Sequence, residues 1–138
     1  MKSIILDSNI FIGAWYKKDQ YQKKSVALIE QVIEKKVGHI FITLFVVLEV
    51  MNFLLKKAPF DVAVDAFDTL IKTDRIHLIA IDTIMMTKIE YFFKKYKNLS
   101  LTDCSLIVIA QELRIPEIYS FDGGFDKVQE IQRKESIS

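Results

Sequence analysis

The sequence contains little cysteine, glycine, proline and histidine: one, four, two and two residues respectively in a chain of 138. The single cysteine, Cys104, excludes an intramolecular disulfide and a thiolate metal cluster, which fits a reducing compartment such as the cytoplasm. Cys104 lacks a candidate base partner and is predicted to be a small buried hydrophobe. With four glycines, neither a GxGxxG nor a GxxxxGKS/T motif occurs, so the common nucleotide-cradling loops are excluded.

The sequence also lacks a long hydrophobic run. Its longest apolar region, residues 41–55, is shorter than a membrane span and contains Glu49 and Asn52. The N-terminal stretch MKSIILDSNIF is interrupted by Asp7 and Asn9 before the apolar core of a signal peptide is complete. Neither membrane insertion nor secretion is predicted.

Neither sign of charge is in excess. Nineteen lysines and arginines balance eighteen aspartates and glutamates, giving a formal net charge of +1, so no global field favours a polyanionic partner. If the acidic residues gather in one cleft, lysine pairs are candidates for flanking a phosphate backbone, although such pairs are also common on ordinary solvated helix faces. The pairs are Lys17-Lys18, Lys23-Lys24, Lys35-Lys36, Lys56-Lys57 and Lys94-Lys95.

The chain is rich in apolar residues, with 51% hydrophobic and 27% charged side chains, which is typical of well-packed globular folds. Its length fits one domain, predicted to span residues 1–138. Short β-branched runs alternate with longer helical patterns, which predicts an α/β fold with a parallel sheet. Strands are expected at residues 3–6, 39–43, 75–81 and 117–121, with a short fifth at 128–133. Helices are expected at residues 20–36, 44–57, 60–73, 83–96 and 101–113.

Two of these helices raise a question about their exposed faces. In the helix at 60–73, three acids spaced i, i+4 and i+7 predict a solvated face rather than a metal site; they are Asp61, Asp65 and Asp68. The predicted buried stripe of that helix consists of Val62, Ala66, Phe67, Leu70 and Ile71. The aromatic segment at 91–96 fits either an exposed association patch or core packing of Phe92, Phe93 and Tyr96.

Four acidic residues close or follow apolar runs, in SIILD, FVVLE, SLTD and IYSFD: Asp7, Glu49, Asp103 and Asp122. They are therefore expected near the core. In a parallel sheet the carboxyl ends of the strands share one edge, and the expected order of elements brings all four acids there. Carboxylates packed together resist ionisation unless a cation binds them. Because hard oxygen ligands select Mg²⁺ or Mn²⁺, we expect a divalent-metal site that hydrolyses phosphate esters.

Each acid also has a purely structural interpretation. The DSN segment at 7–9 fits a helix cap, SLTD at 100–103 fits a capping box, and DGG at 122–124 fits a turn. Glu49 fits the solvated side of an amphipathic helix. These interpretations do not predict that all four acids meet at one edge, so a shared site is preferred.

Other hydrolytic chemistries fit less well. The two histidines, His39 and His77, are expected at the beginnings of strands, opposite the acids, in structural roles. Without a GxSxG motif, a Ser-His-Asp hydrolase is disfavoured. A haloacid-dehalogenase-like phosphatase needs Asp-x-Asp, whereas Asn9 occupies the second position here.

Three segments, in order, resemble the PIN-domain family, the nuclease fold of VapC-type toxins. IILDSNIFI is similar to the family's first strand, and FITLFVVLEVMNFL to its second strand and acid-bearing helix. The most specific segment is LSLTDCSLIVIAQELRIPEIYSFDGGFDKV, which resembles the family's helix-opening Asp, apolar helix, strand and Ser/Thr-Phe-Asp. The resemblance covers nearly the whole chain.

The resemblance implies a parallel sheet of four to five strands in the order 3-2-1-4-5, flanked by helices. It implies a catalytic metal site for Mg²⁺ or Mn²⁺ formed by Asp7, Glu49, Asp103 and Asp122. Asp126 corresponds to an additional acid, expected to bind metal through water. Asn9 and Ser120 correspond to polar positions that support the site by hydrogen bonding.

The function implied by the resemblance is a metal-dependent endoribonuclease that leaves a 5′-phosphate and a 3′-hydroxyl. It would be the toxin of a type II toxin-antitoxin pair, a homodimer silenced by an antitoxin protein across the acidic groove. RNA affinity is expected to depend on lysines near the cleft, such as Lys17, Lys18 or Lys127. Two alternatives stay open: a housekeeping PIN nuclease that trims tRNA or rRNA precursors, and a non-catalytic binding module.

Overall fold

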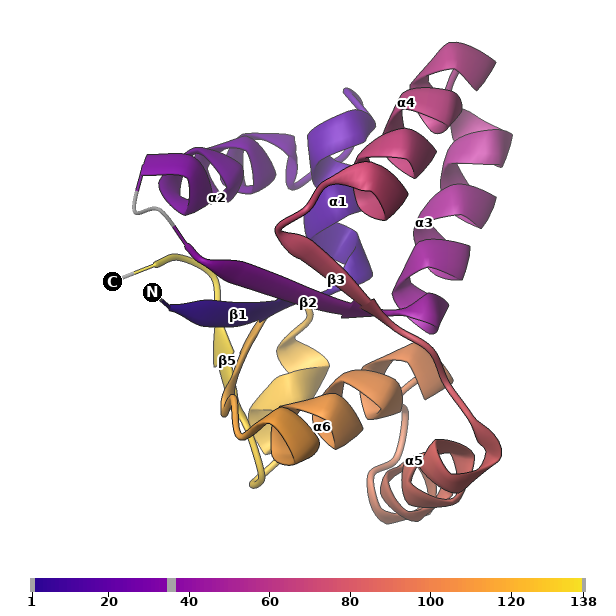
Figure 1. Cartoon of the computed structure of the whole chain (residues 1–138), viewed down its shortest axis with the longest axis vertical. Helices are drawn as coiled ribbons and strands as arrows, with labels where there is room; N and C mark the ends of the chain where they lie inside the picture. The colour runs from indigo at the N-terminus through magenta and orange to yellow at the C-terminus, as the bar shows by residue number, and fades with distance from the viewer. Residues whose placement is uncertain (1, 35–36, 138) are drawn as a thin grey trace.

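The computed structural model describes residues 2–34 and 37–137. Five parallel strands form one sheet in the order β3-β2-β1-β4-β5, which confirms the expected order. The strands are β1 (Ser3–Leu6), β2 (His39–Thr43), β3 (Ile76–Ile79), β4 (Glu117–Tyr119) and β5 (Gln132–Lys134). All of them point the same way, so their carboxyl ends form a single edge of the sheet (Figure 1).

Helices cover both faces of the sheet (Figure 1). They are α1 (Ser8–Trp15), α2 (Gln22–Glu34), α3 (Leu44–Lys57), α4 (Phe60–Lys72), α5 (Thr83–Lys95), α6 (Leu101–Leu113) and the 3₁₀ helix η1 (Gly123–Lys127). The first four helices lie on one side, where α1 packs on α2 and α3, and α3 packs on α4. Helices α5 and α6 pack together on the other side. Within the described ranges, every helix is too short or too polar to cross a lipid bilayer.

The centre of the core is β1, whose residues Ile4, Ile5 and Leu6 are fully buried. Ile5 pairs with Phe41 of β2 on one side and Ile118 of β4 on the other. A strand covered on both faces needs a continuous apolar run rather than alternation, and SIIL supplies it. The position of β1 in the sheet therefore follows directly from its sequence.

Helix α6 is buried over most of its length next to the sheet, because it contacts β2, β4, α3 and α5. Every residue from Thr102 to Ala110 is buried. A hydrogen bond of 2.8 Å between Thr43 Oγ1 and Ser105 Oγ connects the end of β2 to the second turn of α6. The amino end of α6 is thereby fixed at the carboxyl edge of the sheet.

Several expected boundaries need correction. Strands β3 and β4 are shorter than the predicted ranges 75–81 and 117–121, and β5 begins at Gln132 rather than at 128. Helix α1 was not among the expected helices, since only the DSN cap indicated it. Lys35 and Lys36, placed at the end of the helix expected at 20–36, lie outside the described residues.

The buried side of α4 also differs from the prediction. Ala63, Ala66 and Leu70 are buried, whereas Phe67 and Ile71 are 45% and 42% exposed. The predicted helical spacing of apolar residues is correct, but a different side of α4 faces the core. The solvated acidic face is present at Asp61 and Asp65, which are exposed, and Asp68 forms an ion pair with Lys72.

The aromatic segment at 91–96 is partly an exposed patch and partly packed in the core, so each of the two alternatives holds for some of its residues. Phe92 is buried in the core, while Tyr91 and Phe93 are 56% and 50% exposed. Tyr96 is half-buried and donates a hydrogen bond from its hydroxyl to Glu130. Only part of this segment therefore remains as an apolar surface.

The close approach of α1 to α2 generates a stability prediction. A Cβ added at Gly13 would lie 2.8 Å from the Cβ of Ser25 on α2, so Gly13→Ala forces the helices apart. We expect the free energy of unfolding to fall by about 1–3 kcal/mol in urea denaturation, although alanine is the better helix former. Adding Ser25→Gly should restore part of the loss.

Gly123→Ala is the matched control, because a Cβ there has its nearest neighbour at 3.6 Å. Its free energy of unfolding should change little. A Gly13→Ala protein as stable as the parent would show that α1 and α2 are not in this close contact.

Candidate functional site

All four predicted acids lie at the carboxyl edge of the sheet. Asp7 follows β1 directly, caps α1, and donates its backbone N–H to the Tyr119 carbonyl of β4 at 3.0 Å. Glu49 lies in the second turn of α3, which begins where β2 ends. Asp103 is in the first turn of α6, and Asp122 follows β4 as the cap of η1.

The acids differ in burial, which the sequence did not reveal. Asp7 and Asp103 are only 2% and 7% exposed, as expected of residues near the core. Glu49 and Asp122 are exposed instead, so for these two the expectation of burial was wrong. We call the two buried carboxyls, Asp7 and Asp103, the floor of the site. We call the two exposed carboxyls, Glu49 and Asp122, its rim.

Burial and mutual repulsion change the ionisation of the floor. Loss of hydration, and secondarily the negative charges of Asp103 and Glu49, raise the pKa of Asp7 to about 7 against the opposing hydrogen bonds from Ser120 and Ser8. The pKa of Asp103 is also raised, mainly by burial and secondarily by Asp122 and Glu49. Because Asp103 and Glu49 act on the pKa of Asp7, and Asp122 and Glu49 act on that of Asp103, the four side chains form one electrostatic group.

Neutral donors hold the Asp7 carboxyl in place. Its Oδ1 accepts a hydrogen bond from the Ser8 backbone at 2.7 Å, and its Oδ2 accepts one from Ser120 Oγ at 2.7 Å. Asn9 donates from Nδ2 to both Asp7 Oδ2 at 3.3 Å and Ser120 Oγ at 3.0 Å. Asn9 Oδ1 also accepts the Phe121 N–H at 3.2 Å. Asn9 and Ser120 thus have the geometry expected of supporting residues.

The structural interpretations of the acids hold as well. Asp103 Oδ2 accepts the Ser100 N–H at 2.9 Å in a complete capping box, and Asp122 Oδ1 accepts the Gly124 N–H at 2.8 Å. Glu49 accepts a hydrogen bond from Ser8 Oγ at 2.5 Å. Capping and a shared acidic site are therefore compatible in this fold.

The donor set of the floor and rim fits a hard divalent cation, because it consists of carboxylate oxygens without cysteine or histidine. In residues 2–34 and 37–137, no three acidic, histidine or cysteine side chains are already arranged around one point. The carboxyl oxygens are instead directed to caps and hydroxyls. Binding a cation would require these side chains to turn from their hydrogen bonds toward a common centre.

Asp126 has a partner that sequence reasoning missed. Arg133 of β5 binds it with two hydrogen bonds, Nε to Oδ1 at 2.8 Å and Nη2 to Oδ2 at 3.2 Å, which lowers the pKa of Asp126. Arg133 Nη1 also donates to the Ser120 carbonyl at 3.1 Å. The metal role of Asp126 stays a prediction, while this pairing connects β5 to η1 and to the Ser120 backbone.

The two histidines lie away from the acids, whereas Cys104 follows Asp103 directly in α6. His39 Nδ1 and His77 Nε2 are 2.8 Å apart, on the neighbouring strands β2 and β3 and toward their amino ends. Cys104 is fully buried, and burial together with the charge of Asp103 raises the pKa of its thiol to about 11. A protonated, inaccessible thiol fits the predicted role of a small hydrophobe.

A comparison with known protein families agrees with the resemblance found in the sequence. The family model described as PIN domain matches residues 4–131. The chain belongs to the PIN-domain family. It is similar to a VapC ribonuclease of Archaeoglobus fulgidus, with 30% identity over 125 residues that cover 88% of this chain and 78% of the relative.

Solved structures show the same PIN fold. The chain resembles Mycobacterium tuberculosis VapC20, a toxin that cleaves the sarcin-ricin loop, with a TM-score of 0.79 and 13% identity over 91% of this chain and 95% of the other. It also resembles a toxin-antitoxin complex from Klebsiella pneumoniae, with a TM-score of 0.69 and 19% identity over 97% and 99% of the two chains.

The raised pKa of Asp7 predicts how the stability of this PIN domain depends on pH. Without metal, the folded protein keeps a proton on Asp7 up to about pH 7, whereas the unfolded carboxyl ionises near its ordinary value of 3.8. The free energy of unfolding in EDTA should therefore fall as pH rises between these values, on the order of a few kcal/mol. The raised pKa of Asp103 should also lower the free energy of unfolding as pH rises. Urea denaturation across this pH range measures the slope.

Excess Mg²⁺ or Mn²⁺ should raise the melting temperature more at pH 8 than at pH 5, because the ionised acids bind the cation. Asp7→Asn provides the matched control: it should flatten the pH slope in EDTA and remove most of the metal-induced rise. Equal slopes in the parent and the Asp7→Asn protein would contradict the assignment.

Proposed function

We propose that this PIN-domain protein is an endoribonuclease that uses Mg²⁺ or Mn²⁺ and acts as the toxin of a toxin-antitoxin pair. The observation that carries the proposal is the floor of Asp7 and Asp103, whose raised pKa values make the metal-free site electrostatically unfavourable. The names of its relatives, a VapC ribonuclease and a loop-cleaving toxin, support RNA as substrate. They favour a toxin over a housekeeping nuclease or a non-catalytic module.

The proposed role of each residue depends on whether it lies in the floor or on the rim of the site. Asp7 and Asp103 would hold the cation from below, and Glu49 and Asp122 would complete its binding from the rim, where substrate approaches. When bound, the cation supplies positive charge against the negative charge that develops on the phosphate oxygens. Ser120 and Asn9 keep the Asp7 carboxyl oriented. Glu49 also lines a shallow depression of about 250 Å³ together with Asn52 and Thr102, which gives the phosphate backbone access to the rim.

Replacing Asp7 tests this function. Asp7→Asn keeps the shape and the cap of α1 but removes the negative charge, so we expect cleavage of a fluorescent RNA oligomer to fall more than about 100-fold, the scale for losing direct transition-state stabilisation. Products of the parent enzyme should carry 5′-phosphate and 3′-hydroxyl ends. Asp61→Asn removes a charge from the exposed start of α4 and should leave the rate unchanged. Undiminished, EDTA-sensitive cleavage by Asp7→Asn would refute the assignment.

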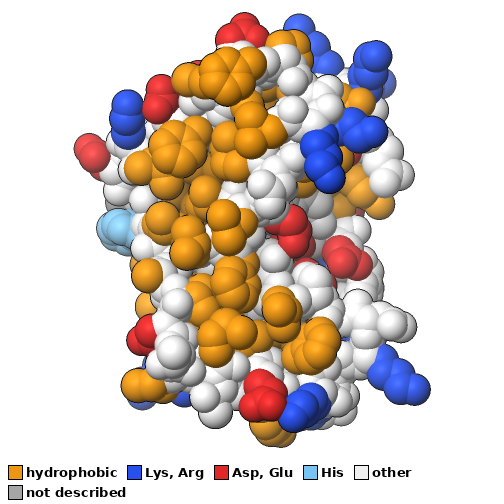
Figure 2. Space-filling view, turned by 90° about the vertical axis from the view of Figure 1, so that its right-hand side faces the viewer, with side chains coloured by type: hydrophobic (Ala, Val, Ile, Leu, Met, Phe, Trp, Pro, Cys, Tyr) orange, Lys and Arg blue, Asp and Glu red, His pale blue; other side chains and the backbone are white. Residues whose placement is uncertain are grey.

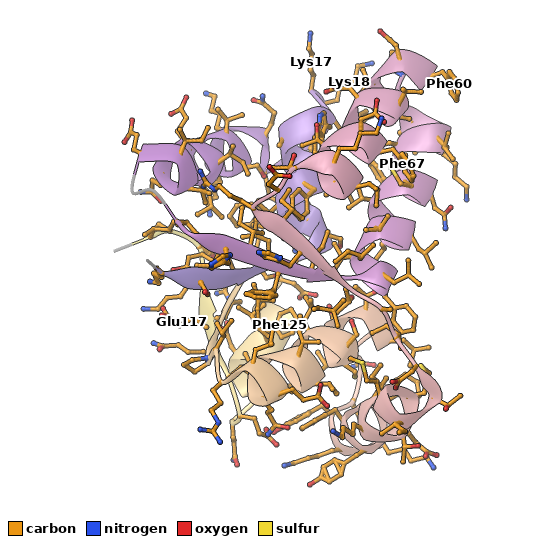
Figure 3. All side chains as sticks on the ribbon, viewed as in Figure 1. Lys17, Lys18, Phe60, Phe67, Glu117 and Phe125 are labelled. Carbon is orange, nitrogen blue, oxygen red and sulfur yellow. The ribbon has the colours of Figure 1, made fainter. Side chains whose placement is uncertain are left out.

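A second copy of the chain is the partner we propose for an apolar face formed by α3 and α4. Large exposed apolar side chains gather on it: Leu44, Leu48, Leu55, Phe60, Val64, Phe67 and Ile71. Figure 2 shows apolar side chains as a broad band on this side of the molecule, and Figure 3 shows Phe60 and Phe67 on α4. Exposed patches of this kind mark protein interfaces. The toxin-antitoxin complex from Klebsiella pneumoniae among the structural neighbours supports an antitoxin as the other partner.

Self-association can be measured by light scattering over a range of concentrations. We expect the parent to form dimers and Phe60→Ser/Phe67→Ser to remain monomeric, because Phe60 and Phe67 are 73% and 45% exposed and contribute little to the core. Ile33→Ser changes a 64% exposed residue on α2 and should leave the dimer intact. A dimer that survives the double substitution would place the interface elsewhere.

A further inference from the structure

We propose that a groove at the carboxyl ends of α1 and α3 binds the single strand of RNA that flanks the scissile phosphate. This helix-end groove has a volume of about 380 Å³, and its lining includes Trp15, Tyr16, Lys17, Lys18, Lys57 and Val62. The inference rests on the proposed ribonuclease function and adds a substrate-binding surface to it. Its three lines of support are its position relative to the acids, its charge and its aromatic rings.

The first support is that the same two helices connect the acids to the groove. Helix α1 is capped by Asp7 and ends at Trp15, and α3 carries Glu49 in its second turn and ends at Lys57. The two helices pack against each other and begin at the same edge of the sheet. Figure 3 shows Lys17 and Lys18 at the end of α1 that lies away from the sheet.

The distance from the acids to the helix-end groove, measured along α1 or α3, suits an RNA strand. Eight residues separate Glu49 from Lys57, and α1 is eight residues long, so each path measures about 12 Å at about 1.5 Å per residue. About three or four stacked nucleotides, at about 3.4 Å each, cover that length. A strand cut at the acids can therefore reach the groove with nucleotides near the cut.

The second support is the positive charge of three lysines that form no ion pair in the described residues. Within residues 2–34 and 37–137, no acidic side chain lies within ion-pair distance of Lys17, Lys18 or Lys57. Other exposed lysines, such as Lys88 and Lys94, are paired with glutamates. Figure 2 shows Lys and Arg side chains grouped above acidic ones on this side of the molecule. Basic residues that lie a few nucleotides away from an acidic centre are suited to other phosphates of the same strand.

The third support is a pair of aromatic rings that are already fixed. Trp15 stacks on Phe11 with ring centroids 6.0 Å apart, and its Nε1 donates to Asp65 Oδ2 at 3.2 Å. Tyr16 packs edge-on against Phe53 at 5.3 Å. Bases stack on such rings without sequence preference, and rings held in place lose little freedom on binding. Helix carboxyl ends alone favour lysine, which accounts for the charge but not for the aromatic hollow.

Trp15 also provides the measurement, because it is the only tryptophan in the chain. In EDTA, which prevents metal-dependent cleavage, a single-stranded RNA of about 12 nucleotides, within the usual site size for such strands, should quench Trp15 fluorescence saturably. Poly-glutamate should not, because it carries negative charge but no bases. Quenching by poly-glutamate and not by RNA would overturn the proposal in favour of an acidic protein segment.

Lysine substitutions test the same groove by affinity. Lys17→Ala/Lys18→Ala/Lys57→Ala should weaken RNA binding at least about tenfold and reduce the slope of log K against log salt by about 2, at about 0.7 per phosphate contact. The control Lys72→Ala/Lys88→Ala/Lys94→Ala removes the same charge from exposed positions on α4 and α5 and should change affinity much less. Circular dichroism confirms that both variants are folded.

The outcomes separate this inference from the proposed function. If the parent cleaves RNA with Mg²⁺ but RNA leaves Trp15 fluorescence unchanged, or both triple variants lose affinity equally, the groove assignment is wrong and the nuclease assignment stands. If the parent neither binds nor cleaves RNA, both are wrong. Saturable quenching together with selective loss in the groove variant establishes the groove as an RNA site.

Discussion

The carboxyl of Asp7 is the group on which the rest of the site depends. It is buried between β1 and α1, where lost hydration and the charges of Asp103 and Glu49 all disfavour its ionised form. Ser8, Asn9 and Ser120 donate hydrogen bonds to it, but they are neutral and leave its net charge uncompensated. A divalent cation, as proposed, would add the positive charge that these donors lack. Binding of a cation would therefore relieve the unfavourable burial of the Asp7 carboxyl, which would favour the folded, metal-bound state.

The topology of the parallel sheet explains why the same residues serve both the fold and the site. Helices that leave a parallel sheet begin at its carboxyl edge, so their amino ends, which favour negative charge, gather there. Asp7, Asp103 and Asp122 accept hydrogen bonds at the beginnings of α1, α6 and η1. Helix capping and the proposed metal binding therefore involve the same carboxyl oxygens. The opposite ends of α1 and α3 lie away from this edge, which separates the lysines of the helix-end groove from the acids.

Sequence reasoning succeeded where one local signal determined the structure. The bounds of β1, β2, α3 and α6 agree with the predicted ranges, because each combines an apolar run with a clear cap or break. Helix α1 was missed because eight mostly apolar residues after a strand carry little periodicity. The inward side of α4 was wrong at Phe67 and Ile71, since period alone does not say which apolar stripe meets the core. The four acids could be assigned to one edge, but the contrast between buried Asp7 and exposed Glu49, and the pairing of Asp126 with Arg133, depend on tertiary contacts.

The most direct measurement of the central claim is anomalous X-ray diffraction from crystals soaked in Mn²⁺ near neutral pH. The account predicts an anomalous peak at the carboxyl edge of the sheet, bound by oxygens of Asp7 and Asp103 with Glu49 or Asp122 turned inward from the rim. An absence of Mn²⁺ there, at a concentration that supports RNA cleavage in solution, would contradict it.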